Sequence, residues 1–415
     1  MVFPAEQVLG RNVEDTMSAT TVIQRSGEDA KAEKALGLQL PFDLVLVLAT
    51  LGLAACSLLT IASATANDIP GNPDYYLTRQ LIYFVVGALL AVVLWRSDYS
   101  RLRELKYFLY GLLILSILTV IAFGSVARGS RRAVDLPLFS FQASELGKVL
   151  LIVSLSAFAI DMTRRMADSR TTVRLMLIGF APAALVMLQP DLGSALVFVA
   201  VTLAILFIAG VPWQHFAAFG ALAVVVTALS LAVLPSVGIN ALHDYQKDRL
   251  TAFLHPSETS GKEGYQQNQS RIAIGSGEKT GRGSRATQTQ YNFLPEHHTD
   301  FIFAVVGERW GFAGAAFVLS LYALLIWRAL RILTMAKNLY GALLAGGIVV
   351  MMMFQVFVNV GMTVGVMPIT GIPLPLMSYG GSSLIATMLA VGLLQSIYAQ
   401  GRRAAMSQGR VLQFQ

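Results

Sequence analysis

The chain contains few charged residues for its length. Only 13% of its 415 residues are Asp, Glu, Lys or Arg, whereas a soluble domain carries about 25%. It has a single cysteine, Cys56, which excludes an internal disulfide. The first long apolar run begins near residue 40, so no cleavable signal peptide is expected. The shortage of charge, together with 55% hydrophobic residues, indicates a protein that crosses a membrane several times.

Apolar runs of the length that a membrane-spanning helix needs, about 20 residues, recur along most of the chain. They lie near residues 41–63, 80–95, 106–124, 141–161, 173–188, 192–210, 213–234, 301–327, 339–366 and 381–399. We therefore predict an all-α polytopic membrane protein with about ten transmembrane helices. No internal repeat relates the first five runs to the last five, which disfavours an inverted-repeat transporter.

Basic residues predict the orientation of these helices. With ten spans, the Lys- and Arg-rich connections at 96–106, 162–174 and 328–337 fall on the same side as the basic tail, and this side is expected to be cytoplasmic. Both termini are then cytoplasmic. The same bias accounts for the net charge of +7 without a nucleic-acid partner. One basic cluster falls on the other side: Arg128, Arg131 and Arg132. An anionic ligand and a chance exception to the rule both explain it.

The polar stretches divide the chain into three parts. Residues 1–39 mix charged with small residues and are expected to be a disordered cytoplasmic tail. Residues 40–400 form the membrane domain, and 401–415 form a second cytoplasmic tail. Within the membrane domain, 235–300 is one long, polar, Gly-rich segment. It is expected to be a large extracytoplasmic loop.

Ionisable residues inside membrane spans are expensive to bury and therefore mark candidate sites. Glu145 and Lys148 are three residues apart in the fourth run, so they share one helix face. A self-neutralising ion pair and a charged wall for a polar ligand both explain them, and we favour the ligand. Asp191 follows Pro190 and is expected to cap the next helix. A ligand role for Asp191 is the second interpretation.

The segment 359–383 cannot be regular helix throughout, because it contains three prolines and a Gly pair. Irregular backbone at membrane depth is tolerated where it is buried or lines a cavity. We predict a re-entrant turn that presents Ser378 and Tyr379 to a site, with an ordinary outer loop as the alternative. His297 and His298 are adjacent but lack a second ligand pair at metal spacing, so no metal site is predicted there.

Five stretches together resemble one known family. SELGK, QPDLGSAL, GYQQNQSRIAIGSG, FLPEHHTDFIFAVVGE and PITGIPLPLMSYGGSS occur in the order found in the SEDS family of shape, elongation, division and sporulation proteins. The resemblance covers about residues 40–400. PITGIPLPLMSYGGSS and the loop sequence are closer to the elongation branch, RodA, than to the division branch, FtsW.

The resemblance implies a peptidoglycan glycosyltransferase that polymerises lipid II on the outer face of the bacterial cytoplasmic membrane. The C4 hydroxyl of an acceptor sugar attacks the anomeric carbon of a donor, and a polyprenyl pyrophosphate leaves. The expected partners are a class B penicillin-binding protein, which is a transpeptidase, and other membrane proteins of the elongation complex. No cofactor is required by the pattern, although a divalent cation would suit the pyrophosphate.

The resemblance also assigns candidate roles. A carboxylate is a usual base for the attacking hydroxyl, and a cation should meet the developing pyrophosphate charge. For the cation we predict Lys148, accompanied by Glu145, with Arg249 and the outer arginines as further candidates. The other candidate substrate-binding residues are Asp191, Gln266, Ser378 and Tyr379.

The chain departs from the family at the loop residue thought to be the catalytic acid or base. Members carry Asp in a pattern like N-P-x-x-D-P-x-G-x-G-Y-Q, and the segment here is HPSETSGKEGYQ, 255–266. Without a gap, Thr259 occupies the Asp position, and its hydroxyl is too weak a base to act alone near neutrality. We predict that Glu258, one residue earlier, supplies the carboxylate, with Glu263 as a weaker candidate.

Two further functions stay open. One is a non-catalytic scaffold that activates the transpeptidase, which the missing Asp favours. The other is a lipid II flippase, which the large outer loop and the lack of a repeat disfavour. A role in division instead of elongation is also open.

Overall fold

The computed structural model describes residues 41–127, 130–135, 140–233, 262–291 and 293–411. The chain divides into two units, Met1–Leu44 and Val45–Gln415. The helical bundle belongs to the second unit, Val45–Gln415. The predicted tail at 1–39 lies outside the described residues.

Each of the ten predicted spans coincides with a helix. They are α2 (Leu44–Ala64), α3 (Tyr75–Arg96), α4 (Lys106–Phe123), α5 (Ala143–Asp161), α6 (Ser169–Met187), α7 (Leu192–Ile208), α8 (Trp213–Val233), α12 (Ile302–Thr334), α13 (Leu339–Val364) and α14 (Gly381–Val411). Within the described residues, eight are long and apolar enough to cross a membrane, and Leu192–Ile208 and Trp213–Val226 are shorter apolar helices. The prediction of a polytopic helical membrane protein is confirmed.

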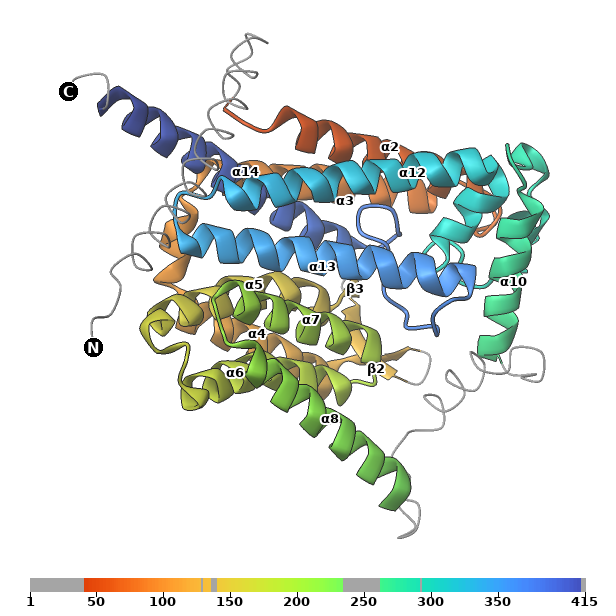
Figure 1. Ribbon diagram of the computed structural model, residues 1–415. Coiled ribbons are helices and arrows are strands. Elements are labelled where there is room, and N and C mark those ends of the chain that lie inside the picture. The colour runs from red at the N-terminus through yellow and green to blue at the C-terminus, as the bar shows by residue number, and fades with distance from the viewer. Residues whose placement is uncertain (1–40, 128–129, 136–139, 234–261, 292, 412–415) are drawn as a thin grey trace, which may run out of the picture. The chain divides into compact units, whose positions relative to one another are not determined.

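Three helices form the centre of the bundle. Most residues of α5, α13 and α14 are buried, because each packs against several neighbours. Helix α13 contacts α12 on one side and α5 and α7 on the other, while α14 packs along α3 (Figure 1). Helix α14 also extends the last predicted span, since it continues to Val411 through most of the expected tail. Polar side chains on α5 are therefore held in the interior.

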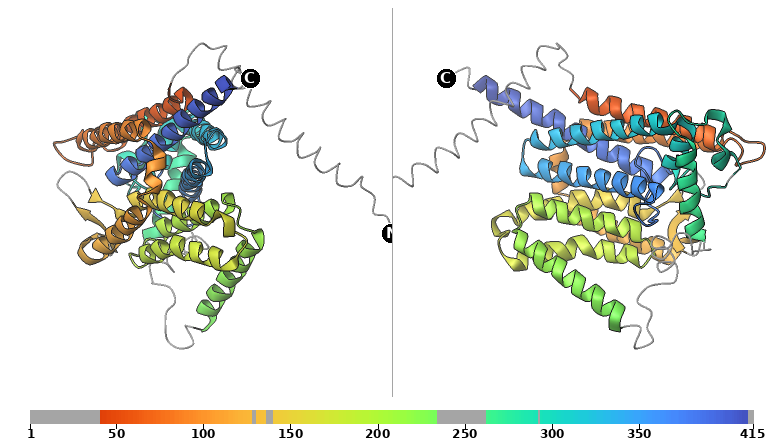
Figure 2. Two further views of the ribbon diagram at one scale, coloured as in Figure 1. Left: turned by 90° about the vertical axis from the view of Figure 1, so that its left-hand side faces the viewer. Right: turned by 45° about the vertical axis from the view of Figure 1, so that its right-hand side comes forward.

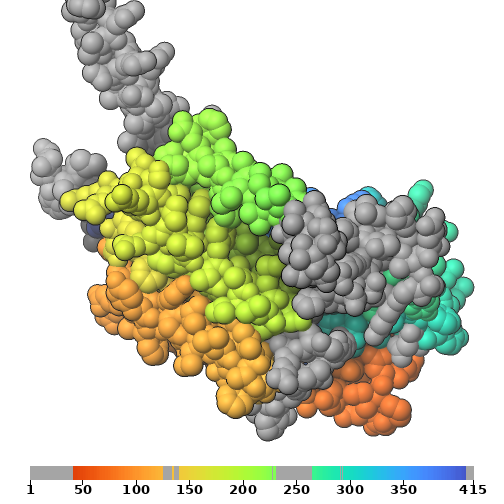
Figure 3. Space-filling view, turned by 90° about the horizontal axis from the view of Figure 1, so that it is seen from below, coloured from red at the N-terminus to blue at the C-terminus, as the bar shows by residue number. Residues whose placement is uncertain are grey.

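The outer helices present apolar side chains to the surroundings. Residues of α4, α6 and α8 lie beside one another on the face shown in Figure 3. Large apolar side chains of these three helices are exposed, including Phe108, Leu115, Leu177 and Leu222. An exposed apolar surface of this kind suits contact with lipid, because its contact with water would be unfavourable.

A small sheet, which the sequence analysis did not predict, connects α4 to α5. Strands β1 (Ser125–Ala127), β2 (Ser130–Asp135) and β3 (Ser140–Phe141) pair antiparallel in that order. The predicted basic outer segment therefore includes β2, whose residue Arg131 is in register with Val126. The side chains of Arg131 and Arg132 and the whole of Arg128 lie outside the described part of the chain.

The described part of the predicted outer loop is mostly helical. It contains α10 (Lys262–Ser276), a 3-10 turn η4 (Gly283–Arg285) and α11 (Thr287–Gln290). Helix α10 runs across the ends of α12 and α13 (Figures 1 and 2). Residues 234–261 of this segment lie outside the described residues.

Helix α12 is interrupted where the α10 segment meets it. Gly311 has φ 64° and ψ −160°, a backbone conformation open to glycine but not to other residues. A Cβ at this position would lie 2.4 Å from the Gly281 backbone nitrogen. The predicted span at 301–327 is therefore two helices joined at a kink, which allows the turn after α10 to approach the backbone closely.

The connection between α13 and α14 is irregular and buried. Helix α13 ends at Val364 and is capped by Gly365, which adopts a left-handed conformation, and α14 starts at Gly381. Leu374 and Met377 within the connection are fully buried. We call residues 365–380 the re-entrant segment. Its buried residues suit the re-entrant interpretation, which stays a prediction.

Candidate functional site

The first turns of α5 carry a buried ion pair. Lys148 Nζ lies 2.7 Å from Glu145 Oε1, and each side chain is only 2% exposed. Glu145 is in the first turn of α5, where the helix dipole favours a negative charge. The ammonium has three N–H donors, and one of them points to Glu145. The structure confirms that the two residues share a face, and their contact with substrate stays a prediction.

Asp191 links the starts of two helices. Its Oδ1 accepts a hydrogen bond from the Ser194 backbone N–H at 3.1 Å, which caps α7 as predicted. Its Oδ2 accepts from the Ser144 hydroxyl at 3.3 Å and from the Gln142 amide at 3.4 Å. Asp191 therefore positions α7 against the turn of α5 that carries the ion pair.

The re-entrant segment lies against the start of α7. A Cβ on Gly193 would be only 2.6 Å from the Thr370 carbonyl oxygen, so glycine is needed for this approach. At the start of α14, Ser382 Oγ donates to the Ser140 carbonyl at 2.9 Å and accepts from the Gln142 N–H at 3.0 Å. These contacts bring the segment next to α5 as well.

Ser378 is used to hold the backbone in place. Its hydroxyl donates to the Thr299 carbonyl at 2.6 Å and accepts from the Leu374 N–H at 2.8 Å. Gln80 on α3 donates to the Ser378 carbonyl at 3.2 Å. These two contacts of the hydroxyl are with the backbone, and the predicted binding of substrate by Ser378 stays a prediction.

Tyr379 lies beside the turn that precedes α12. Its backbone N–H donates to the His298 carbonyl at 2.9 Å, and its ring makes edge contacts with the rings of Tyr76 and His298. Burial, reinforced by the neighbouring Tyr83, raises the pKa of the Tyr379 phenol. The phenol is therefore neutral near pH 7 and keeps its proton as a hydrogen-bond donor.

Helix α10 is attached to the re-entrant segment by Gln267, the residue that follows the predicted Gln266. Gln267 is buried and donates to the Met367 carbonyl at 3.1 Å, and Ser270 donates to the Thr363 carbonyl at 2.8 Å. Gln266 is half-buried on the same helix. Gln267 was not singled out because a run of polar residues gives no periodic signal to separate the two.

Glu308 is a buried carboxylate that the sequence analysis did not assign. Its oxygens accept from the Gln288 N–H at 2.8 Å, the Thr289 N–H at 3.1 Å and the Thr289 hydroxyl at 2.7 Å. It is fully buried. These hydrogen bonds fasten α11 to α12, which gives Glu308 a structural role.

Several predicted residues fall outside the described residues. They are the candidate catalytic residues Glu258 and Thr259 and the candidate pyrophosphate ligand Arg249. The side chain of Glu263 is also outside them. Their roles stay predictions from the sequence.

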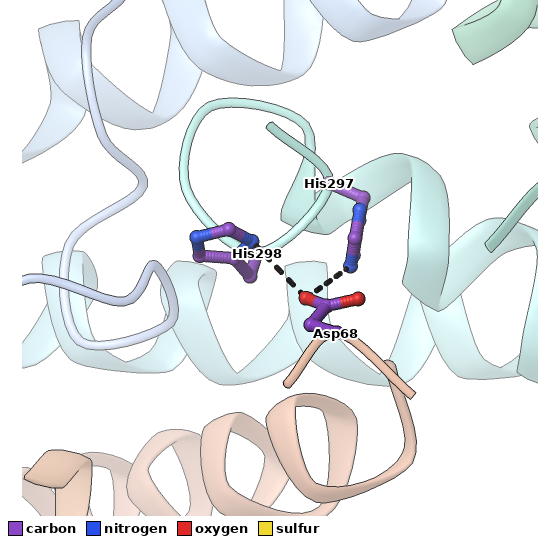
Figure 4. A group of neighbouring side chains, drawn as sticks. All are labelled: Asp68, His297 and His298. Atoms are coloured by element: carbon purple, nitrogen blue, oxygen red, sulfur yellow. Dashed lines mark ion pairs between the residues drawn. The ribbon is translucent and has the colours of Figure 1, made fainter. Parts of the chain in front are cut away.

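One group of three side chains in the described part of the chain has ligand atoms placed for a metal ion: Asp68, His297 and His298 (Figure 4). No metal site was predicted here, because the two histidines lack a second ligand pair at metal spacing in the sequence. The third side chain, Asp68, lies in the connection between α2 and α3, far from the histidines along the chain.

The contacts above join five separate stretches at one end of the bundle. They are the starts of α5 and α7, helix α10, the turn before α12 and the re-entrant segment. Each contains one of the five motifs singled out in the sequence. Motifs that contact one another after folding are the expected arrangement of a shared site.

Comparisons with known proteins agree with this arrangement. The model of the FtsW, RodA and SpoVE family, described as "Cell cycle protein", matches residues 39–403. The peptidoglycan glycosyltransferase MrdB of Escherichia coli K12 is 35% identical over 366 residues, which cover 88% of this chain and 95% of that protein. The probable peptidoglycan glycosyltransferase FtsW of Thioalkalivibrio sulfidiphilus is 35% identical over 394 residues, covering 92% and 96%.

A solved structure has the same fold. It carries the description "Structural coordination of polymerization and crosslinking by a peptidoglycan synthase complex". One of its chains superposes with a TM-score of 0.71 at 32% identity, covering 87% of this chain and 98% of its own.

Proposed function

The chain belongs to the FtsW, RodA and SpoVE family, and from this membership we propose that it is a peptidoglycan glycosyltransferase that joins lipid II units into glycan strands. The chain is a multi-pass membrane protein. We place it in the bacterial cytoplasmic membrane with both termini cytoplasmic, on the distribution of its basic residues.

The observation that carries the proposal is the contact among the five family motifs. A fold alone would not assign a reaction, because one fold supports many functions. Here polar residues of separate motifs meet near a lysine that is buried together with its glutamate partner. Two relatives that match over nearly their whole length, MrdB and FtsW, are named a peptidoglycan glycosyltransferase and a probable one.

The proposed reaction forms one bond and breaks another. The acceptor C4 oxygen bonds to the donor anomeric carbon, its proton passes to a carboxylate base, and the donor's bond to pyrophosphate oxygen breaks. We assign the base to Glu258. Lys148 is assigned to the leaving pyrophosphate, since its ammonium has three donors and bonds to Glu145 with one of them within the part of the chain that the structure describes.

A partner follows from the solved complex. Because a chain of the same fold occurs in a peptidoglycan synthase complex, we propose that this chain works with a class B penicillin-binding protein.

Between elongation and division, we favour a role in cell elongation, because the motifs resemble those of RodA. Relatives named MrdB and FtsW match at the same 35% identity, so depletion in cells decides: rounded cells indicate elongation and filaments indicate division.

Polymerisation by the purified chain tests the proposal. With its partner and labelled lipid II in vesicles, the chain should produce a ladder of glycan strands. Lys148→Met should reduce the rate by about 10²–10³-fold. Lys337→Met is the matched control, because Lys337 pairs with Asp98 outside this site. No product under conditions in which MrdB polymerises would contradict the assignment.

A non-catalytic scaffold is the second candidate, favoured by Thr259 at the position of the family Asp. It predicts that the transpeptidase is stimulated equally by the natural chain and by Lys148→Met. Loss of stimulation in Lys148→Met alone, with the protein folded, would count against it.

A further inference from the structure

Asp68, His297 and His298 come from two distant segments and point toward one another (Figure 4). Asp68 lies between α2 and α3, and the histidines lie in the turn before α12. Asp68 Oδ2 is 3.3 Å from His297 Nε2 and 3.8 Å from His298 Nδ1. The three ligand atoms all lie within 4.8 Å of one another.

The partners of His297 assign the proton on its ring. Nδ1 lies 3.1 Å from the Leu294 carbonyl oxygen, which can only accept, so Nδ1 carries hydrogen. In the neutral ring Nε2 then carries a lone pair instead of a hydrogen, and this lone pair faces the Asp68 carboxylate. Within the described residues, Nε2 is buried and makes no hydrogen bond. A lone pair opposite a carboxylate is repulsive, so a positive charge belongs between them.

A divalent cation supplies this charge better than a proton does. Two imidazole rings turn toward one carboxylate oxygen, and a single hydrogen can lie between that oxygen and only one of the two rings. The side chains of His297, His298 and Asp68 are only 5%, 17% and 11% exposed. One metal ion would accept both nitrogens and the carboxylate as ligands at the same time.

The distances fit such an ion. A tetrahedral zinc site with bonds of about 2.0–2.1 Å places its ligand atoms about 3.4 Å apart. The two measured separations from Asp68 Oδ2 are 3.3 and 3.8 Å. The bond from His297 Nδ1 to a backbone carbonyl is also the contact that orients metal-binding histidines.

We propose that Asp68, His297 and His298 bind a divalent transition-metal ion, with zinc as the best fit. Imidazole ligands favour such an ion over magnesium. Three protein ligands leave one tetrahedral position for water or a substrate oxygen.

The ion would connect the α2–α3 connection to the turn before α12. That turn holds the re-entrant segment through the bond from the Tyr379 N–H to the His298 carbonyl. The rings of Tyr76 and Tyr379 flank His298, with centroids 4.7 and 5.8 Å away. Metal binding would therefore stabilise the end of the bundle where the family motifs meet.

Zinc binding to the full chain tests the proposal independently of polymerase activity. The purified chain is stripped with a chelator and titrated with zinc against a competing dye. One zinc per chain should bind and raise the melting temperature. X-ray absorption should show two imidazole ligands with metal–nitrogen distances of about 2.0–2.1 Å.

Variants localise the site. Asp68→Asn and His297→Gln should each weaken zinc binding by at least about 100-fold, since even residues behind the ligands cost 10- to 100-fold. His215→Gln is the matched control, because His215 contacts Thr172 on α6 away from this group. Its affinity should be unchanged.

Two results would overturn the proposal. One is the absence of stoichiometric zinc binding, which would leave an imidazolium–carboxylate pair as the explanation of the cluster. The other is a wild-type absorption spectrum without imidazole ligands, which decides the matter even where a variant does not fold.

Discussion

Glu145 and Lys148 neutralise each other inside the bundle, with 2.7 Å between carboxylate and ammonium and 2% exposure on each side chain. The sequence placed both on one helix face, and the structure shows the direct contact. Removing one member of a buried pair leaves a charge without its partner, whereas removing both does not. Comparing the single variants with the double variant therefore distinguishes a stabilising role of the pair from a catalytic role.

The first prediction concerns this pair. Glu145→Gln and Lys148→Met should each lower the free energy of unfolding by about 3–5 kcal/mol, and the double variant should cost much less than their sum. The measurement is a double-mutant cycle by reversible unfolding in detergent. Polymerisation should stay low in the double variant despite its recovered stability. If the double variant recovered both its stability and its polymerisation rate, the pair would have a stabilising role alone.

The second prediction concerns Glu308. Glu308→Gln replaces one accepting oxygen with an NH₂ group that faces the N–H groups of α11, so it should destabilise the protein by about 1–3 kcal/mol. Hydrogen exchange at Gln288 and Thr289 should accelerate. Glu278→Gln is the control, because Glu278 is exposed. Equal exchange in the two variants would show that the carboxylate does not hold α11.

The third prediction concerns the kink in α12. Gly311→Ala should cost at least about 2 kcal/mol, because alanine disfavours this backbone conformation and its Cβ would meet the turn after α10. Gly111→Ala on α4 is the control. Its Cβ would meet nothing within 4 Å, and helix propensity favours alanine by about 1 kcal/mol. Melting temperatures should therefore change in opposite directions.

The fourth prediction concerns the base in the loop. If Glu258 takes the hydroxyl proton, Glu258→Gln should lower the polymerisation rate by about 10²–10⁴-fold. Adding Thr259→Asp to that variant should restore activity, because it returns a carboxylate to the family position. Glu263→Gln is the control and should change the rate little. Full activity in Glu258→Gln would assign the base elsewhere.

Local features of the site were predictable from the sequence. The cap made by Asp191 involves Ser194 only three residues later, and the Glu145–Lys148 pair spans three residues of one helix. Contacts between distant segments were not predictable. Ser378 was expected to face a ligand but bonds to Thr299, and the structural role of Glu308 depends on α11 packing against α12.

The sequence by itself determined the ten helices, because an apolar run of sufficient length satisfies its own backbone hydrogen bonds within one segment. It also determined the family, since the five motifs are contiguous stretches. Only the tertiary structure decided that Asp68 meets His297 and His298 and that α10 crosses the ends of α12 and α13. It also decided that β1, β2 and β3 pair into a sheet. These contacts join segments whose spacing along the chain has no fixed period, so they arise only when the helices pack.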